Sequence, residues 1–175
     1  GAKIASFGVG DRLITSKSEP VFGGVYKLAA VEDKQGNIIP KIKISANPDK
    51  ITNPHFKKVY RIFENETGKA MADLICVHDE VIDPTKPLTI FDQFAVWKTK
   101  TLTEFTAREL QVPVFRHGEL VYKLPTLKEI KENCAKELDT LWDEVKRFEN
   151  PHRYYVDLSQ KLWDTRSALL KKLSK

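Results

Sequence analysis

The stretch KVYRIFENETGKAMADLICV, residues 58–77, contains two apolar runs separated by a polar segment. Residues 58–63 and residues 70–77 each have the β-branched and apolar composition that is typical of a strand. The segment between them, residues 64–69, includes Gly68, which we expect to adopt a positive φ in the turn. The sequence therefore predicts an antiparallel hairpin at the centre of the fold.

Shorter strands are expected on both sides of this hairpin. Turn residues at 33–37 and at 116–119 each separate two apolar segments, which predicts two further hairpins. A connector rich in turn residues runs from 45 to 55, and residues 96–106 alternate like a strand without helical periodicity. The other expected strands cover residues 21–31, 38–44, 88–91, 112–115 and 120–122.

From Thr126 onward the apolar residues recur with the period of a helix. Thr126 and Glu129 have the spacing of a capping box, so we expect one helix over about 126–149 and a second over about 157–173, beginning at Asp157. We expect the two helices to pack as a pair. The fold class is therefore α+β, with β-hairpins followed by a C-terminal helix pair. The apolar stripe expected on the first helix comprises Leu127, Ile130, Cys134, Leu138, Leu141, Val145 and Phe148.

Composition excludes a fibrous, disordered or membrane-spanning protein. The chain of 175 residues is 41% apolar and 30% charged, and it has no apolar run of about 18 residues. It lacks an initiator Met and a signal segment and enters almost at once into an expected strand, which suggests a piece of something longer. Cys76 and Cys134 are interpreted as buried thiols in a reducing compartment, so a cytoplasmic location is expected.

The positive charge lies in one third of the chain. Residues 1–60 carry ten Lys and Arg against five Asp and Glu, whereas residues 61–175 carry nineteen of each. Downstream, Lys and Glu alternate as on solvated helix faces. This asymmetry favours a local anionic ligand, such as a phosphorylated metabolite, over a long polyanion.

The basic third begins with IASFGVGDRL, residues 4–13, an expected strand followed by two glycines. Glycine at such a position permits a positive φ and lets backbone N–H groups approach an anion closely. The alternative is an ordinary tight turn. Arg12 and Lys17 would complement a phosphate or simply aid solubility. Asp11 would instead bind a ribose hydroxyl, a Mg²⁺ carried by a diphosphate, or Arg12.

The remaining polar candidates have simpler interpretations. Cys, His and Asp residues nowhere show the spacing of a metal motif. His78, with Asp79 and Glu80, is either a general acid or base at a strand end or part of a solvated loop. The four histidines are His55, His78, His117 and His152, and the three tryptophans, interpreted as core or interface aromatics, are Trp97, Trp142 and Trp163.

Read in order, six segments resemble the C-terminal third of bacterial nicotinate phosphoribosyltransferases. The segments are SFGVGDRLITS (6–16), GGVYKLAAVE (23–32), PKIKISANPDKITNP (40–54), KKVYRIFENETGKAMADL (57–74), TLTEFTARELQVPVF (101–115) and LWDEVKRFENPHRYYVDLSQKLWD (141–164). The resemblance covers essentially the whole chain. It implies an enzyme of NAD salvage that makes nicotinate mononucleotide and diphosphate from nicotinate and phosphoribosyl diphosphate, coupled to ATP hydrolysis with Mg²⁺.

The resemblance also implies a division of the chain. Residues 1–44 would be the end of an irregular α/β barrel of the type II phosphoribosyltransferase class, and residues 45–175 an accessory C-terminal domain. The family's phosphorylated histidine and nicotinate-binding residues lie upstream, so no catalytic residue is expected here and the chain alone would be inactive. The expected partners are nicotinate, phosphoribosyl diphosphate, the upstream part of the enzyme and a second subunit of a homodimer, with no nucleic acid and no membrane.

By resemblance, the residues that contact the phosphoribosyl phosphate are Gly8, Val9, Gly10, Asp11 and Arg12. Two positions depart from the family pattern. Many members have Thr where this chain has Asp11, and a Pro-Gly pair often stands where this chain has Pro54-His55.

Two other classes of function are compatible with the residues. One is a free-standing basic module for nucleic acid or another polyanion, with a steep salt dependence. The other is a purely structural or interaction domain in which the glycine loop is only a turn. The lysines that the basic module would gather on one face are Lys3, Lys17, Lys27, Lys41, Lys43 and Lys50.

Overall fold

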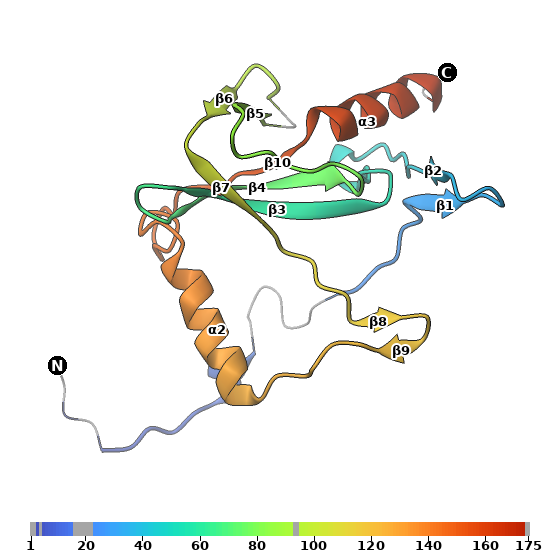
Figure 1. Ribbon diagram of the computed structural model, residues 1–175. Helices are drawn as coiled ribbons and strands as arrows, with labels where there is room; N and C mark the ends of the chain where they lie inside the picture. The colour runs from blue at the N-terminus through green and yellow to red at the C-terminus, as the bar shows by residue number, and fades with distance from the viewer. Residues whose placement is uncertain (1–2, 4, 16–22, 93–94, 174–175) are drawn as a thin grey trace.

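The computed structural model describes residues 3, 5–15, 23–92 and 95–173 of the chain. Within these ranges the fold is α+β, as the sequence predicts: short antiparallel strands are followed by two longer helices (Figure 1). No helix among the described residues is long and apolar enough to cross a membrane.

The predicted central hairpin is confirmed. Strand β3 (Lys57–Glu64) pairs antiparallel with β4 (Ala70–Val77), and Gly68 in the turn has a φ of +67°. Strand β7 (Phe105–Glu109) pairs antiparallel with β3 on its other side, and β10 (Val156–Leu158) pairs parallel with β4. The sheet order is therefore β10-β4-β3-β7.

One face of this sheet carries the main core. Strand β5 (Leu88–Phe91) and β6 (Thr99–Leu102) form a separate hairpin that packs over it. The strand expected at 88–91 is thus confirmed, and the alternating segment 96–106 supplies β6 and the start of β7. The buried residues of this core are Tyr60, Ile62, Ala72, Leu74, Cys76, Ile90, Leu102 and Phe105.

Helix α2 (Leu127–Asp139) begins with the predicted capping box but ends ten residues before the expected 149. The backbone N–H of Ala70 donates to the Thr140 carbonyl at 2.8 Å, and Lys69 Nζ donates to the Asp139 carbonyl at 2.6 Å. These bonds to the start of β4 take up carbonyls that a longer helix would use internally. No residue of α2 is buried, so its predicted apolar stripe faces outward and Cys134, expected to be buried, is exposed.

The second helix also differs from the prediction at its start. Residues 156–158 form β10, because they pair with β4, and α3 (Gln160–Leu173) follows. Ser159 Oγ accepts a hydrogen bond from the Leu162 N–H at 3.2 Å and so caps the first turn. Leu158 and Leu162 pack with Val77 in a second buried cluster.

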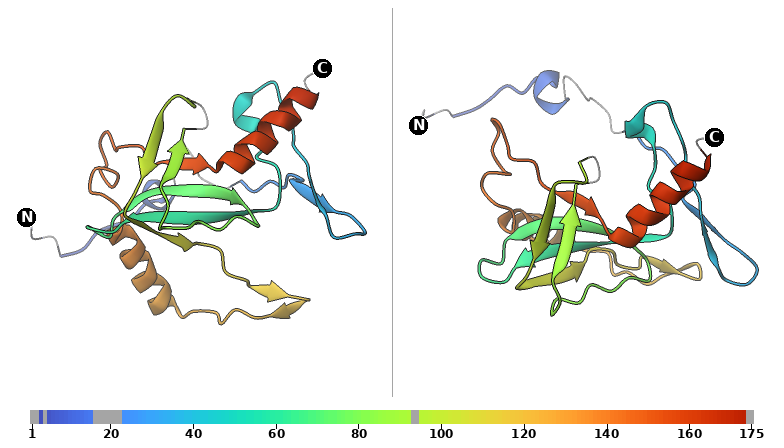
Figure 2. Two further views of the ribbon diagram at one scale, coloured as in Figure 1. Left: turned by 45° about the horizontal axis from the view of Figure 1, so that its top comes forward. Right: turned by 90° about the horizontal axis from the view of Figure 1, so that it is seen from above.

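Both predicted C-terminal helices are present, but they do not pack against each other as expected. In Figure 1, α2 lies below the central sheet and α3 above it, and the two views of Figure 2 keep them apart. Each helix contacts a different part of the sheet: α3 lies against β4, whereas α2 reaches the sheet through its C-terminal end. An apolar stripe indicates that a helix packs against some element, but it does not specify which element.

The outer hairpins are shorter than expected. Strand β1 (Ala30–Glu32) pairs with β2 (Ile38–Pro40), so the described parts of the strands expected at 21–31 and 38–44 are mostly irregular; residues 21 and 22 lie outside the described ranges. Strand β8 (Phe115–Arg116) pairs with β9 (Glu119–Leu120) around the predicted turn. A short 3-10 helix, η1 (Pro48–Lys50), lies within the predicted connector.

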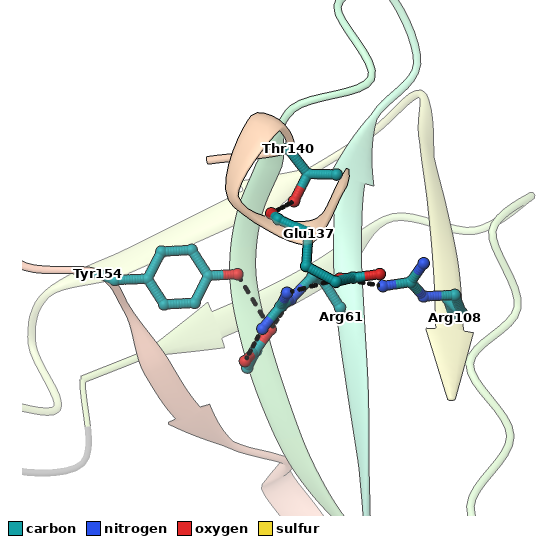
Figure 3. A network of polar contacts seen from close by, with 6 residues as sticks. Arg61, Arg108, Glu137, Thr140 and Tyr154 are labelled. Atoms are coloured by element: carbon teal, nitrogen blue, oxygen red, sulfur yellow. Dashed lines mark hydrogen bonds and ion pairs between the residues drawn. The ribbon is translucent and has the colours of Figure 1, made fainter. Parts of the chain in front are cut away.

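A polar network on the face of the sheet opposite the main core joins distant segments. The strand register places Arg61 of β3 opposite Asp73 of β4 and opposite Arg108 of β7. Arg61 Nε and Nη2 donate to the two carboxylate oxygens of Asp73 at 2.9 and 3.0 Å, and Arg61 Nη1 donates to Glu137 Oε2 at 3.1 Å. Tyr154 donates its hydroxyl to Asp73 at 3.0 Å (Figure 3).

We expect Arg61→Leu to lower the free energy of unfolding by about 2–4 kcal/mol, because it leaves the half-buried Asp73 carboxylate without its bidentate partner. Lys86→Ala, which removes an exposed ion pair with Asp83, is the matched control and should change stability by less than about 0.5 kcal/mol. Urea unfolding measures both. Equal effects of the two substitutions would contradict the structural role of Arg61.

Candidate functional site

The glycine loop lies at the exposed N-terminal edge of the structure. Residues 5–10 have no regular secondary structure, and α1 (Asp11–Ile14) is a single turn closed by a 2.9 Å bond from the Leu13 N–H to the Gly10 carbonyl. The strand expected before the loop is absent at residues 5–7, and Ile4 and Lys17 lie outside the described ranges. A strand needs a neighbour to satisfy its backbone groups, and no described strand runs beside this segment (Figure 1).

The fold of this chain does not itself require glycine in the loop. Gly8 and Gly10 do not have positive φ, and a Cβ built on either would meet no heavy atom within 4 Å. Both positions are exposed. If glycine is needed at positions 8 and 10, the reason lies outside this chain's own fold. A ligand or another part of the protein that approaches the backbone closely would provide such a reason. The predicted phosphate contacts of Gly8–Arg12 remain a prediction.

The structure brings together only two of the four histidines. The rings of His55 and His78 stack with centroids 5.7 Å apart, and Phe56 lies 5.0 Å from His78. His117 instead occupies the β8–β9 turn, and His152 donates its N–H to the Glu144 carbonyl. No group of three or more potential metal ligands occurs among the described residues.

The residues after His78 have structural partners. Asp79 accepts two hydrogen bonds from Lys161 Nζ, at 2.7 and 2.6 Å, and this contact lowers the pKa of the Asp79 carboxyl. Glu80 Oε2 accepts from the Val77 N–H and from Ser159 Oγ, both at 2.7 Å. Both acids therefore attach the end of β4 to the start of α3, which favours the loop interpretation of the triplet over an acid–base site.

His55, one of the two positions that the resemblance marks as a departure, has a φ of +82°. The surrounding contacts hold this conformation. The His55 N–H donates to the Ala29 carbonyl at 2.7 Å, Lys57 Nζ donates to the His55 carbonyl at 2.7 Å, and His55 Nδ1 accepts from the Phe56 N–H at 3.0 Å. A glycine at this position would adopt the left-handed backbone without steric cost.

We expect His55→Gly to change the free energy of unfolding by less than about 1 kcal/mol, because relief of the strained φ offsets the greater chain entropy of glycine. His55→Val should lower it by about 2 kcal/mol or more, because a β-branched residue tolerates positive φ poorly. Urea unfolding of the two variants gives the comparison. A valine variant as stable as the glycine variant would mean that the backbone at this position relaxes freely.

A pocket of about 930 Å³ lies between the β5–β6 hairpin and the segment that leads into β10. It contains an acidic pair that the sequence analysis did not identify, Asp92 and Asp157, with Arg153 Nη1 at 3.4 Å from Asp92 Oδ2. Asp157 is 5% exposed, and burial, followed by the charge of Asp92, raises the pKa of its carboxyl to about 6. The sequence contains one signal for a buried acid, because Asp157 lies inside the apolar run YYVDL, residues 154–158. Asp157 is instead predicted, from the sequence, to begin a helix.

We expect Asp157→Asn to raise the free energy of unfolding by about 1–3 kcal/mol near pH 7.5 and by much less near pH 4.5. In the folded state the pKa of Asp157 is about 6, above its ordinary value of 3.8. Between pH 3.8 and pH 6 the folded state therefore binds the proton more tightly than the unfolded state does. As the pH rises through this range, the Asp157 carboxyl destabilises the folded state. Urea unfolding at both pH values tests this. Exposed Asp139→Asn is the control, and a stability difference for Asp157→Asn that does not depend on pH would contradict the assignment.

Comparison with known proteins connects this fold to one family. A family model described as the nicotinate phosphoribosyltransferase C-terminal domain matches residues 56–166. The chain belongs to the nicotinate phosphoribosyltransferase family. The match includes all four strands of the central sheet, α2 and the first half of α3, whereas the glycine loop precedes it.

Whole-chain relatives carry the same name. The chain is 39% identical to nicotinate phosphoribosyltransferase of Bacillus subtilis over 166 residues, which is 95% of this chain and 34% of that protein. It is 36% identical to the Caenorhabditis elegans protein, over 92% of this chain and 28% of the relative. The chain thus spans about a third of the length of the curated relatives it matches.

A solved structure shows the same fold. The crystal structure of human nicotinic acid phosphoribosyltransferase matches 71% of this chain and 24% of its own length, with a TM-score of 0.60 and 22% identity. Together with the family match, this confirms the resemblance inferred from the six sequence segments. The expected boundary between residues 44 and 45 stays a prediction.

Proposed function

We propose that this chain acts as the C-terminal part of a nicotinate phosphoribosyltransferase. The proposed reaction forms nicotinate mononucleotide and diphosphate from nicotinate and phosphoribosyl diphosphate, with ATP hydrolysis, in cytoplasmic NAD salvage. The match of residues 56–166 to the family's C-terminal domain carries the proposal, and the 39% identity to the Bacillus subtilis enzyme supports it. A free-standing basic module is not favoured, because the relatives carry the name of an enzyme.

Within the proposed enzyme the chain has two roles. Residues 1–44, as the end of the barrel, supply backbone N–H groups of Gly8–Arg12 to the phosphoribosyl phosphate. Residues 45–175 form a structural domain that supports the catalytic part and a homodimer. Two observations are compatible with the first role: the loop is exposed, and both glycines have open space around them.

The chemistry assigned to this chain is binding and positioning. Transfer of a phosphoribosyl group depends on alignment of the reactants and on stabilisation of the departing diphosphate. The loop contributes by holding the phosphate end of the substrate. None of the four histidines is assigned a catalytic role, and ATP and Mg²⁺ are assigned to the rest of the enzyme. The chain alone is therefore inactive in this proposal.

We expect Gly10→Val in the full-length protein to lower kcat/KM for nicotinate mononucleotide formation by about 100-fold, because a side chain displaces the phosphate from the loop. The fold should be retained, since no heavy atom lies within 4 Å of the added Cβ. Gly24→Val is the matched control, because Gly24 is also exposed and has open space. Full activity of Gly10→Val would refute the loop's role, whereas an inactive wild-type protein would refute the proposed reaction.

A further inference from the structure

Helix α2 presents an apolar surface that nothing in the described structure covers. The residues Leu127, Ile130, Cys134 and Leu138 recur at helical spacing on one side of α2, and we call them the α2 stripe. Leu127 is 82% exposed, Ile130 51% and Leu138 48%. An apolar stripe on a helix of a folded protein normally packs against another element, so this one indicates a missing contact.

The segment that leads into α2 also carries exposed apolar side chains. Apolar side chains of the β8–β9 hairpin and of the run that follows it are exposed, and the ribbon carries them to the same side of the central sheet as α2 (Figure 1). Exposed apolar side chains that gather on one side of a protein indicate an interaction site. The exposed residues of this segment include Val112, Phe115, Leu120 and Leu124.

Contacts at the C-terminal end of α2 attach the helix to the sheet and so orient the α2 stripe, while a local capping box begins the helix. At the C-terminal end Glu137 Oε2 accepts from Arg61 at 3.1 Å and from Arg108 at 2.6 Å. At the N-terminal end Thr126 and Glu129 complete a capping box. A helix of this length is marginal when isolated, so these contacts hold α2 in place with its apolar side outward.

We propose that the α2 stripe docks on the catalytic part of the same polypeptide, the part that corresponds to the two thirds of its relatives' length that this chain does not span. The inference rests on the proposed function. Covalent attachment favours this occupant over a second copy, because a tethered partner has an effective concentration of roughly millimolar. Residues 5–10 have no neighbouring strand among the described residues, which is compatible with a contact outside this chain.

Cys134 provides a probe inside the α2 stripe. In the folded full-length protein, we expect its modification by a thiol reagent to be at least about tenfold slower than that of an exposed cysteine on the opposite side of α2. The control is a variant in which Cys134 is replaced by Ser and Lys136 by Cys. Residues two apart on a helix do not lie on the same side, so the cysteine at position 136 lies outside the α2 stripe. Peptide mapping by mass spectrometry separates Cys134 from Cys76, which is buried and whose pKa is raised to about 12 by burial.

Each outcome of the labelling decides the proposal. Protection of Cys134 that does not change with protein concentration supports it. Equal rates at Cys134 and at the control cysteine overturn it. Protection that disappears on dilution also overturns it, because it would assign the α2 stripe to a second copy. Nicotinate mononucleotide formation by the same preparation tests the proposed function separately, so the two failures are distinguishable.

A pair of charge substitutions provides an independent test. Ile130→Lys should lower the Tm of the full-length protein by at least about 4 °C, because it places a charge in the docked surface. Glu132→Lys, two residues away on the exposed side, should leave the Tm within about 1 °C. Equal shifts for the two variants would overturn the proposal, since Ile130 would then be as solvated as Glu132.

Discussion

The guanidinium group of Arg61 joins strand β3 to strand β4 and to the end of helix α2. The strand register places Arg61 opposite Asp73, and the two form a bidentate pair. Arg61 also donates to Glu137 at the end of α2. Asp73 in turn accepts a hydrogen bond from the hydroxyl of Tyr154. Segments separated by more than 70 positions in the chain are thereby attached to one face of the sheet. Desolvation makes such a pair costly unless every partner is present, so the network specifies one arrangement of these segments.

That arrangement leaves a domain with one well-packed face and one exposed helix. The core under the β5–β6 hairpin is closed, whereas α2 buries none of its residues and presents its apolar side to solvent. The docking that we propose for the α2 stripe would explain this asymmetry, since the relatives are about three times as long as this chain. An apolar stripe costs free energy in water, and a larger protein removes that cost by covering it.

The glycine loop and His55 differ in what their backbone depends on. The glycines of the loop make no close contact within the chain, so their use has to be sought in what approaches from outside. At His55 the opposite holds: the backbone has the left-handed φ that glycine suits, and local hydrogen bonds hold a histidine in it. The conformation of His55 is therefore explained by the fold itself, whereas phosphate binding by the glycine loop is a proposal.

Local chemistry in the sequence determined the β3–β4 hairpin with Gly68 in its turn, the capping box at Thr126 and the family resemblance, because each depends on residues close together in the chain. Tertiary structure alone decided that α2 ends at Asp139, that residues 156–158 form a strand and that the two helices lie apart. It also brought Asp157 beside Asp92. These features depend on hydrogen bonds and burial between distant segments, which periodicity and local propensity do not encode.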